Sequence, residues 1–385
     1  MTDGVQVEIN LDALRHNLQR VRHYAPNSRV IAMIKSNAYG HGLLPCAKAL
    51  READAFGVAR FDSAITLRGA NIKQPIILMP GFFSKEDLML LSVHQCDAVL
   101  HNEEQLELLE KTPLMAPIRI WIKVNAGMNR LGFALDDVRD VHARLMMLRQ
   151  VKRPINFMMH FAWNDPGKHD VLTKQYQLFQ NAIKDLGGEI SVSKSAAIIA
   201  HPDIKNDWVR PGIMLYGVSP FKGHQSSEYE LKPVMTVKAK LISVRHQKKG
   251  DVVGYGEQFE CPEDMLMGVA GVGYGDGYPS KAKPGTPMLI RGKRCELVGR
   301  VNMDMLHVDL RHCPDAKVGD EITLFGESLA IEEIADVSDL LVYTLLTGFG
   351  QRQCKIKFNE SALEPHKIKL QKSDKSYQPQ QTHAK

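Results

Sequence analysis

A lysine stands at the end of an almost wholly apolar stretch near the N-terminus. Residues 30–34 read Val-Ile-Ala-Met-Ile, and Lys35 follows them. Tyr39 comes four residues after Lys35, and two glycines, Gly40 and Gly42, come soon after it. The apolar run predicts a buried β-strand with Lys35 at its exit. An ammonium group at the mouth of an apolar strand loses hydration, so its pKa falls and the amine becomes a usable nucleophile. The alternative is a structural lysine whose alkyl chain lies along the strand end while its charge reaches water.

Apolar strand patterns alternate with amphipathic helix patterns up to residue 216, in units of roughly 20 to 35 residues. Parallel strands joined by right-handed helical crossovers produce this alternation, and eight units fit a closed (β/α)8 TIM-type barrel. An open, doubly wound sheet is the alternative, but no GxGxxG motif follows the first strand. The predicted barrel strands are Val30–Lys35, Phe56–Arg60, Ile76–Pro80, Ala98–His101, Ile118–Val124, Ile155–His160, Ile190–Ser195 and Val209–Tyr216. The predicted helices are Leu11–Tyr24, Leu43–Ala53, Asp62–Gly69, Lys85–Val93, Glu103–Glu110, Asp136–Arg149 and Asp170–Leu186.

The pattern changes after residue 231, where short strands separated by Gly and Pro replace the strand–helix units. This pattern predicts a mainly-β second domain with one helix, at Ile331–Leu340. The sequence therefore predicts three parts: a barrel at residues 1–231, a mainly-β domain at 232–358, and a polar, disordered tail at 359–385. The predicted strands of the second domain are Met235–Val244, Gly268–Gly273, Met288–Ile290, Glu296–Arg300, Leu306–Leu310 and Glu321–Phe325.

Length and composition narrow the class of protein. A chain of 385 residues with 44% hydrophobic residues is long enough for two domains with large cores. The net charge of +5 comes without a basic stripe interleaved with aromatic residues, so we expect no nucleic-acid partner. We also expect no membrane span and no signal peptide, because the sequence has no suitably long apolar run and no basic start. Six cysteines without a CxxC pair indicate reduced thiols in a cytoplasmic protein and no metal site.

The barrel hypothesis places catalytic groups at the carboxyl ends of the strands. Polar residues stand at those ends or in the loops that follow them, and they include a lysine, a serine and an arginine. A lysine nucleophile, a Ser–Gly anion pocket and an arginine around one lumen predict a pyridoxal 5′-phosphate cofactor held as a Schiff base. The residues concerned are Lys35, Lys123, Arg130, His160, Ser195 and Arg210.

Over roughly residues 5 to 358 the chain resembles the bacterial alanine racemases, a family of pyridoxal phosphate enzymes. Lys35-Ser-Asn-Ala-Tyr39-Gly-His-Gly42 is similar to the cofactor-lysine motif of that family, and further motifs follow in the order of the family. The resemblance implies a barrel plus a β domain, and a head-to-tail homodimer in which the β domain of one subunit completes the site of the other. The further motifs are Gly127–Phe133, Met159–Phe161, Ser193–Ala197, Val209–Ile213, Gly273–Pro279 and Val298–Asp304.

The resemblance implies two catalytic bases. Lys35 would carry the cofactor and then act as the base on one face of the substrate, and Tyr274 of the partner subunit would be the base on the other face. Racemisation removes a proton from one face of a carbon and delivers one to the other, so two opposed bases suffice. Asp304 resembles the residue that helps to position the region of the catalytic tyrosine.

Further positions match residues that hold the cofactor in the family. Arg210 would hydrogen-bond the pyridine nitrogen and His160 would buttress Arg210. Because arginine stays charged, that nitrogen would remain unprotonated, which limits delocalisation of the carbanion and favours reprotonation over other reactions. Hydroxyl and amide donors would bind the phosphate without a formal counter-charge. These donors are the side chains of Tyr39, Ser195 and Tyr343 and the backbone amides near Gly212 and Ile213.

Arg130, assisted by the backbone at Met303, would bind the substrate carboxylate. Lys123 matches a lysine that is often carbamylated in the family, a change that would turn a cation into an anion able to hold Arg130. The chain also departs from the family pattern. Lys194 stands where asparagine is usual, Ser280 where arginine is usual, and residues 350–354 replace the usual Arg-Val-Pro-Arg ending.

These resemblances predict an alanine racemase that supplies D-alanine for peptidoglycan, with a small-molecule amino-acid substrate. A racemase of serine, or of a broader set of amino acids, is the alternative on the same scaffold. A decarboxylase of basic amino acids would require a carboxylate in the place of Arg210. A non-catalytic pyridoxal phosphate carrier would resemble the barrel alone.

Overall fold

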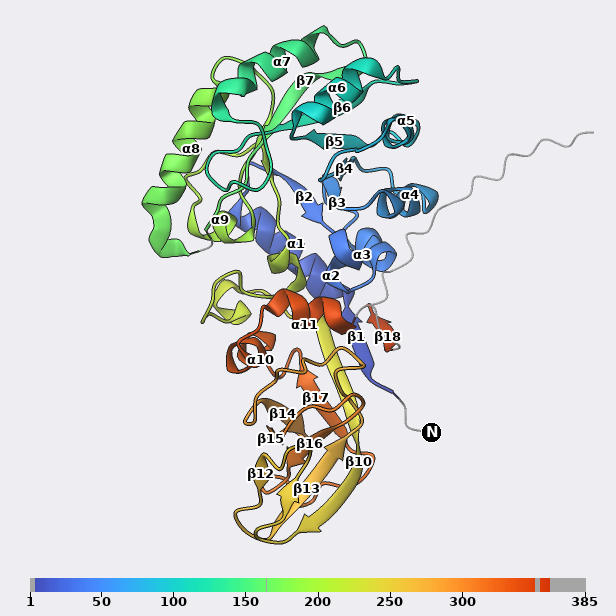
Figure 1. The fold of residues 1–385 in the computed structure, drawn as a ribbon, viewed down its shortest axis with the longest axis vertical. Coiled ribbons are helices and arrows are strands. Elements are labelled where there is room, and N and C mark those ends of the chain that lie inside the picture. Colours follow the sequence, from blue (N-terminus) through green and yellow to red (C-terminus); the bar gives the residue numbers. More distant parts are fainter. Residues whose placement is uncertain (1–3, 164, 350–353, 361–385) are drawn as a thin grey trace, which may run out of the picture.

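The computed structural model describes residues 4–163, 165–349 and 354–360. Within these ranges the chain forms two eight-stranded sheets, one wholly parallel and one mainly antiparallel, which lie one above the other in Figure 1. The parallel sheet contains strands β2 to β9, in the order in which they follow along the chain. The prediction of a TIM-type barrel followed by a mainly-β domain is confirmed.

The parallel sheet closes into a barrel where β8 and β9 come together. Backbone hydrogen bonds join the segments after β8 and around β9, from Arg210 N to Ser193 O (2.9 Å) and from Asp207 N to Ile190 O (3.1 Å). Apolar side chains of these strands are buried on both faces, as expected of a parallel sheet covered by helices. The strands are β2 Arg29–Met33, β3 Ala55–Val58, β4 Ile76–Leu78, β5 Asp97–Leu100, β6 Ile118–Lys123, β7 Val151–Met158, β8 Ile190–Ser191 and β9 Trp208–Val209.

All eight predicted barrel strands are present, but the sequence prediction for the last one is wrong in length. The pattern predicts a strand over Val209–Tyr216, whereas β9 ends at Val209 and a 3-10 helix, η3, covers Ile213–Tyr216. Pro211 has no N–H to donate to a neighbouring strand, so the chain leaves the sheet there. This turn places the backbone of Gly212 at the carboxyl end of the barrel.

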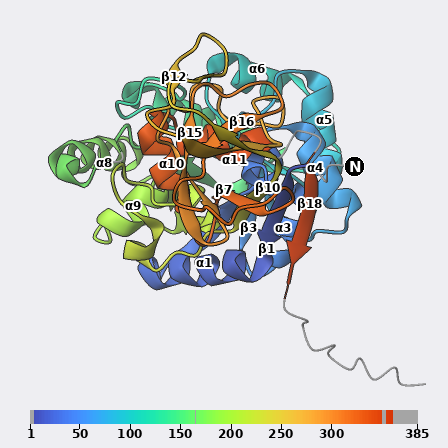
Figure 2. The same cartoon turned by 90° about the horizontal axis from the view of Figure 1, so that it is seen from below.

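Helices surround the barrel, and Figure 2 shows them as a ring around the second sheet when the molecule is viewed from its lower end. Asn10 caps α1, since its side chain accepts a hydrogen bond from Ala13 N at 2.9 Å. The helices of this part are α1 Leu11–Tyr24, α2 Lys35–Tyr39, α3 Leu43–Ala49, α4 Phe61–Gly69, α5 Lys85–Val93, α6 Glu103–Lys111, α7 Val138–Met147, α8 His169–Ile183 and α9 Ser195–Ala200. Short 3-10 turns η1 Leu135–Asp137, η2 Pro166–Lys168 and η4 Ser226–Tyr229 lie between them.

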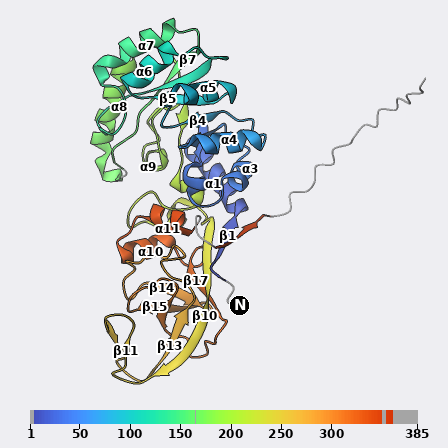
Figure 3. The same cartoon turned by 45° about the vertical axis from the view of Figure 1, so that its right-hand side comes forward.

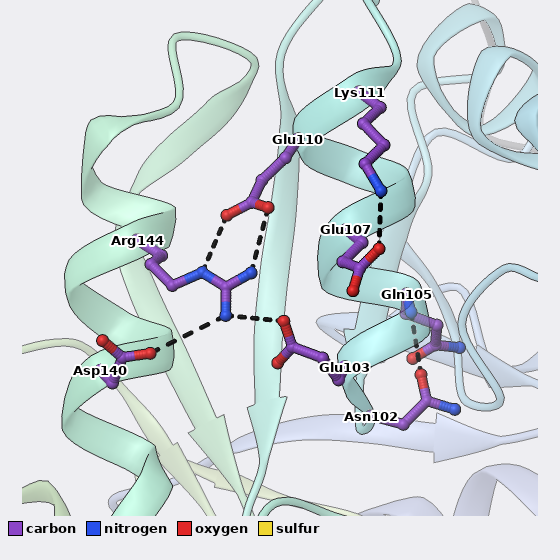
Figure 4. Close-up of polar contacts among 8 residues, drawn as sticks. All are labelled: Asn102, Glu103, Gln105, Glu107, Glu110, Lys111, Asp140 and Arg144. Carbon is purple, nitrogen blue, oxygen red and sulfur yellow. Dashed lines mark hydrogen bonds and ion pairs between the residues drawn. The ribbon is translucent and has the colours of Figure 1, made fainter.

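Two neighbouring barrel helices, α6 and α7, are joined by a network of charged side chains (Figure 4). Arg144 on α7 makes two parallel hydrogen bonds with Glu110 on α6, at 2.9 and 3.0 Å, and an ion pair with Glu103 at 2.7 Å. Asp140 lies 3.8 Å away on the helix of Arg144 itself. The fork of the guanidinium matches the carboxylate, so this network fixes how α7 lies beside α6 although its members are partly exposed.

The second sheet takes strands from both ends of the described chain. β1 pairs antiparallel with the long strand β10 and parallel with β18, so it lies in this sheet and not in the barrel. Figure 3 shows β10 running along the whole sheet, and the edge strand β13 also pairs with β10, which closes the strands from β10 to β17 of this sheet into a ring. The strands are β1 Gln6–Asn10, β10 Met235–Gln247, β13 Met265–Ala270, β14 Pro287–Ile290, β15 Lys293–Val298, β16 Leu306–Asp309, β17 Glu321–Phe325 and β18 Lys355–Asn359, and a small hairpin, β11 Val252–Val253 with β12 Phe259–Glu260, stands beside them.

The prediction of one helix in the second part is wrong, because two are present. The first, α10 Ile331–Ser338, lies where it is predicted, and α11 Val342–Phe349 follows it. The run Leu340 to Leu346 is apolar and includes a valine, an aromatic residue and a threonine, so its pattern does not distinguish a helix from a strand. The boundaries at 231 and 358 stay predictions, and residues 350–353 and most of the predicted tail, 361–385, lie outside the described residues. No helix of the described ranges combines the length and apolar character needed to cross a membrane.

A buried asparagine connects the barrel to the segment that leads into the second sheet. The side chain of Asn17, on α1, donates to Leu215 O (3.0 Å) and Lys232 O (2.8 Å) and accepts from Lys232 N (2.8 Å). All three partners are backbone groups, and Asn17 is fully buried. Removing the amide would leave these groups without water or a protein partner.

We therefore expect Asn17→Ala to lower the free energy of unfolding by about 2 to 3 kcal/mol, because one buried and two partly buried hydrogen bonds are lost. Equilibrium urea unfolding of the full chain measures this. Gln19→Ala, on the exposed side of the same helix, is the matched control and should change stability by no more than about 0.5 kcal/mol. Equal effects of the two substitutions would contradict the role given to Asn17.

Candidate functional site

A cavity of about 350 Å³ opens at the carboxyl ends of the barrel strands. Ten of the thirteen predicted site residues line it, and they come from strand ends and loops far apart in the sequence. Polar groups at this end of apolar strands are what a barrel active site requires. The ten residues are Lys35, Tyr39, Lys123, Arg130, His160, Ser195, Arg210, Gly212, Ile213 and Tyr343.

Lys35 is followed by a left-handed helical turn. Four consecutive residues, Ser36 to Tyr39, have φ angles between 52° and 54°. Left-handed backbone costs L-residues about 1 kcal/mol or more each, so surrounding contacts must stabilise the turn. The sequence pattern gives no sign of this turn, because none of the four residues is glycine.

Two side chains hold the left-handed turn. The buried imidazole of His41 lies with Nδ1 3.0 Å from Ala38 O and 2.9 Å from Tyr39 O, and because both partners are carbonyls, Nδ1 carries the proton and donates. Asn37 Oδ1 accepts from Leu43 N at 2.8 Å, where α3 begins. Burial lowers the pKa of His41 to about 4, so the ring stays neutral and keeps this arrangement at physiological pH. The sequence prediction includes His41 in the motif from Lys35 to Gly42 but assigns it no role.

Aromatic rings form one wall of the cavity. Tyr39 stacks on Tyr216 with ring centroids 4.6 Å apart, and the ring of Tyr343 lies 6.0 Å from that of Tyr39. Tyr216 is buried and donates its hydroxyl to Met33 O at 2.8 Å. Sequence reasoning misses Tyr216, since a buried tyrosine on a short turn has no distinguishing pattern. This packing holds the hydroxyls of Tyr39 and Tyr343 beside each other at the cavity.

Donors for an anion gather around the start of α9. Ser195 Oγ accepts from Gly212 N at 3.0 Å and from Met214 N at 3.4 Å, so the serine and these amides lie within reach of one another. A Cβ atom at Gly212 would lie 2.4 Å from the hydroxyl of Tyr39, and therefore only glycine fits there. Burial raises the pKa of Tyr39, so its hydroxyl stays protonated and can donate. Hydroxyls and amides in this arrangement fit a phosphate group.

Arg210 is buried and fixed on its inner side by neutral acceptors. It donates to Ser191 Oγ (2.7 Å), to Met159 O (2.6 Å), and more weakly to His160 Nδ1 (3.5 Å). Burial, Arg210 and the neighbouring lysines lower the pKa of His160, so this ring is neutral and Nδ1 can accept. The predicted contact between His160 and Arg210 is therefore present, and it orients the guanidinium at the cavity.

Five cationic side chains line the cavity, and no Asp or Glu of the described residues does so. The side chain of Lys35 is exposed at the cavity, where partial desolvation and then the charge of Arg130 lower its pKa. Burial, Arg210 and Arg130 hold the pKa of Lys123 well below its usual value. Such an arrangement favours an unprotonated amine at Lys35 and attracts anions. The five are Lys35, Lys123, Arg130, Lys194 and Arg210.

The remaining predicted site residues, Tyr274, Met303 and Asp304, do not line this cavity. They lie together on two loops of the second part, where Tyr274 N donates to Asn302 O (3.0 Å) and Gly275 N to Met303 O (2.7 Å). Tyr274 is 39% exposed and Met303 is 56% exposed. The structure thus brings these residues near each other but does not bring them to the lining of the cavity that contains Lys35.

Comparison with known proteins gives one family for both parts of the chain. The family model for the alanine racemase N-terminal domain matches residues 9–220, and that for the C-terminal domain matches residues 234–357. Curated alanine racemases of Coxiella burnetii and Aeromonas hydrophila are 44% and 45% identical over 349 and 345 residues, covering 89% and 90% of this chain and 96% and 97% of the relatives. The crystal structure of biosynthetic alanine racemase from Pseudomonas aeruginosa matches with a TM-score of 0.89 and 36% identity, covering 93% of this chain and 99% of that one.

The left-handed turn gives a prediction about stability. Ser36 is exposed and has a φ of 52°, so Ser36→Gly should raise the free energy of unfolding by about 1 kcal/mol because glycine adopts this backbone without strain. Ser63→Gly, in the right-handed helix α4, is the matched control and should lower stability by about 0.5 kcal/mol. Urea unfolding of both variants measures the contrast, and a loss of stability in both would contradict it.

Proposed function

The chain belongs to the alanine racemase family, and we propose that the cavity around Lys35 is its active site, completed by Tyr274 of the partner subunit. Its activity is that of the family, the pyridoxal 5′-phosphate-dependent interconversion of L- and D-alanine. In the family this D-alanine serves peptidoglycan synthesis. The assignment of the site rests on one observation: Lys35 opens into a cavity that is lined by cationic side chains. Both halves of the chain match the family.

The residues present fit the cofactor. The cavity offers a lysine of lowered pKa, a cluster of hydroxyl and amide donors for a phosphate, and a buried arginine beyond them. Pyridoxal phosphate, when bound, supplies a conjugated ring that takes up the electrons of the Cα–H bond of an amino acid. Tyr39, Ser195 and Tyr343, with the amides of Gly212 and Ile213, would hold the phosphate, and Lys35 would hold the cofactor covalently.

Lys35 and the partner's Tyr274 would handle the proton. Lys35 reaches the substrate from the barrel floor, so its Nζ would take or return the α-proton on that face. Two groups on opposite faces are needed because a single base returns the proton to the face from which it came. The exposure of Tyr274 and its absence from the lining of the Lys35 cavity in its own chain support a role across subunits. Asp304, on the neighbouring loop, would help to position that tyrosine.

Arg210 would face the ring nitrogen and keep it unprotonated. Burial lowers the pKa of Arg210 to about 9, which is still above physiological pH, and buried acceptors hold the guanidinium, so it is charged at pH 7. His160 stays neutral and fixes Arg210 from the side. This pairing limits the withdrawal of electrons from the reacting carbon, which favours return of the proton over decarboxylation or transamination.

The substrate carboxylate would bind Arg130, which lines the cavity, together with the backbone at Met303 of the partner subunit. Lys123 would position Arg130. As a plain lysine it is a buried amine of lowered pKa between two arginines, which repel its charged form. Carbon dioxide reacts with unprotonated amines, and the resulting carbamate is an anion. We therefore propose that Lys123 is carbamylated and pairs with Arg130.

The family is typically dimeric, and we propose a head-to-tail homodimer with shared active sites and a cytoplasmic location. Exposed methionines beside Tyr274, Met303 and Met305, support an interface on these loops. Five of the six cysteines are buried without a disulfide in the described residues, which agrees with reduced thiols. The five are Cys46, Cys96, Cys261, Cys295 and Cys313.

The alternatives to alanine racemisation are not favoured. The named relatives are alanine racemases, which argues against a broader or serine-specific racemase. A decarboxylase would require a carboxylate at the position of Arg210, and a carrier would match the barrel alone.

The two-base assignment predicts an asymmetric effect of Tyr274→Phe. One alanine enantiomer should lose exchange of its α-proton with D₂O by about 10²- to 10⁴-fold, because its base is removed, while the other, served by Lys35, keeps exchanging. Proton NMR of purified protein with each enantiomer measures this. Tyr24→Phe, on the outer helix α1, is the control and should leave both exchange rates unchanged. Mild, equal losses for both enantiomers in Tyr274→Phe would argue against two bases.

The proposed carbamate predicts a specific NMR signal. Protein equilibrated with ¹³C-bicarbonate should give a carbamate carbonyl resonance that disappears in Lys123→Met, and the KM for alanine should rise in that variant because Arg130 loses its anion. Lys48→Met, an exposed lysine on α3, is the control and should retain the signal. A wild-type protein without this resonance, or a variant that keeps it, would exclude carbamylation at Lys123.

A further inference from the structure

We propose that Lys194 is an additional cofactor-binding residue of this chain, whose ammonium pairs with an anionic oxygen of pyridoxal phosphate and makes cofactor affinity depend on pH. This inference rests on the proposed function, which places the cofactor between Lys35 and Arg210. It concerns a residue that departs from the pattern the chain otherwise resembles, in which asparagine is usual.

The position of Lys194 in the barrel supports this role. It is the last residue before α9, and it forms a parallel β-bridge with Arg210 at the seam where the barrel closes. Its chain neighbour is Ser195, around which the phosphate donors gather. Lys194 therefore stands between the residues proposed for the ring nitrogen and those proposed for the phosphate, and its side chain lines the cavity.

The ammonium of Lys194 is anchored but not neutralised. Nζ donates to Phe161 O at 2.9 Å, which uses one of its three donors. In the part of the chain that the structure describes, no carboxylate forms a recorded ion pair with it, and its charged neighbours Arg130 and Arg210 are both cations. Two N–H donors thus remain for an anion brought into the cavity.

Electrostatics also favours an anion at Lys194. Burial, followed by the charges of Arg130 and Arg210, lowers the pKa of Lys194 to about 8. A bound oxyanion reverses this effect, because it supplies the opposite charge that the protein does not, and so raises the pKa. Without a bound anion the group is therefore mostly protonated at pH 7 and loses its proton around pH 8, whereas a bound anion keeps it protonated to higher pH. Linkage then requires anion affinity to be highest below pH 8 and to fall above it.

The other titratable groups around the cavity either keep their charge between pH 6.5 and 9.5 or are the same in all the proteins that the test compares. His160 stays neutral because its pKa is lowered, and burial raises the pKa of both tyrosines. Burial lowers the pKa of Arg210 to about 9, but Arg210 is present in all the variants below. Lys35 and Lys123 also have lowered pKa values, but they are unchanged in the variants below. The titratable and charged groups that face the cavity with Lys194 are Lys35, Tyr39, Lys123, Arg130, His160, Arg210 and Tyr343.

A structural role for Lys194, as a donor to Phe161 O alone, gives different expectations. Lys194→Gln keeps a donor for that carbonyl but removes the charge, whereas Lys194→Arg keeps a charge that does not titrate. If Lys194 only joins the start of α9 to the segment after β7 through this hydrogen bond, the Lys194→Gln variant should behave as the wild type. If its charge binds the cofactor, Gln should weaken the cofactor and Arg should not.

The test measures the dissociation constant of pyridoxal phosphate from the full-length holoenzyme by dilution and absorbance between pH 6.5 and 9.5. At pH 7 we expect Lys194→Gln to raise this constant by about 10- to 100-fold, the size of one charge-assisted hydrogen bond. The difference should shrink as the pH rises above 8, and Lys194→Arg should lose that part of the pH dependence. Lys174→Met, an exposed lysine on α8, is the control and should match the wild type.

A second arm identifies the oxygen by repeating the titration with pyridoxal, which lacks the phosphate. If Lys194→Gln weakens the binding of pyridoxal phosphate but not of pyridoxal, Lys194 pairs with a phosphate oxygen. If it weakens the binding of both ligands, Lys194 pairs with the oxygen on the ring. Unchanged affinity for both overturns the proposal, whether or not the KM for alanine rises. If borohydride fails to trap the cofactor on Lys35 in the wild type, the proposed function itself fails, whereas trapping in both proteins with equal affinities rejects the Lys194 inference only.

Discussion

The position of Lys35 at the cavity depends on a backbone that this sequence does not adopt readily. Four non-glycine residues after Lys35 are left-handed, and such strain persists only where surrounding contacts fix it. His41 supplies those contacts through two carbonyls, and its ring remains neutral because burial lowers its pKa. Gly40 has Leu346 O so close that no Cβ would fit, so α11 packs directly on the turn. That contact carries Tyr343 to the cavity, and one local turn therefore positions Lys35, Tyr39 and Tyr343 together.

The second constraint is charge. A barrel end with five cations and no lining carboxylate among the described residues is costly while it holds no anion, since each ammonium or guanidinium is repelled by the others. This cost is lower because the guanidinium of Arg210 donates hydrogen bonds to neutral acceptors and because His160 is neutral. It leaves the lysines with lowered pKa values. The same repulsion that destabilises the empty cavity makes Lys35 a better nucleophile and makes multiply charged anions bind tightly.

The sequence predicts the architecture better than the local geometry of the site. Strand and helix spacing reveal the barrel because burial imposes a period, and short strands with Gly and Pro reveal the β part. The left-handed turn at Ser36 to Tyr39 and the helix α11 are missed, because long-range packing decides them and neither has a distinct pattern. The gathering of residues such as Lys35, Arg130 and Ser195 follows from the barrel and from family motifs, whereas Tyr343 reaches the cavity on α11. The bonds between them, such as Ser195 with the amide of Gly212, come only from coordinates.

The separation of Tyr274 from Lys35 in one chain has a geometric cause. Lys35 follows the carboxyl end of β2 and lines the cavity, so the proposed second base would have to reach the cavity from outside the barrel. In this chain the mouth is bordered by Tyr343, while Tyr274 is tied by its backbone to Asn302 on the other sheet. In the proposed dimer, the β part of a second copy would bring its Tyr274 phenol to the cavity of Lys35 and would cover the exposed Met303 and Met305.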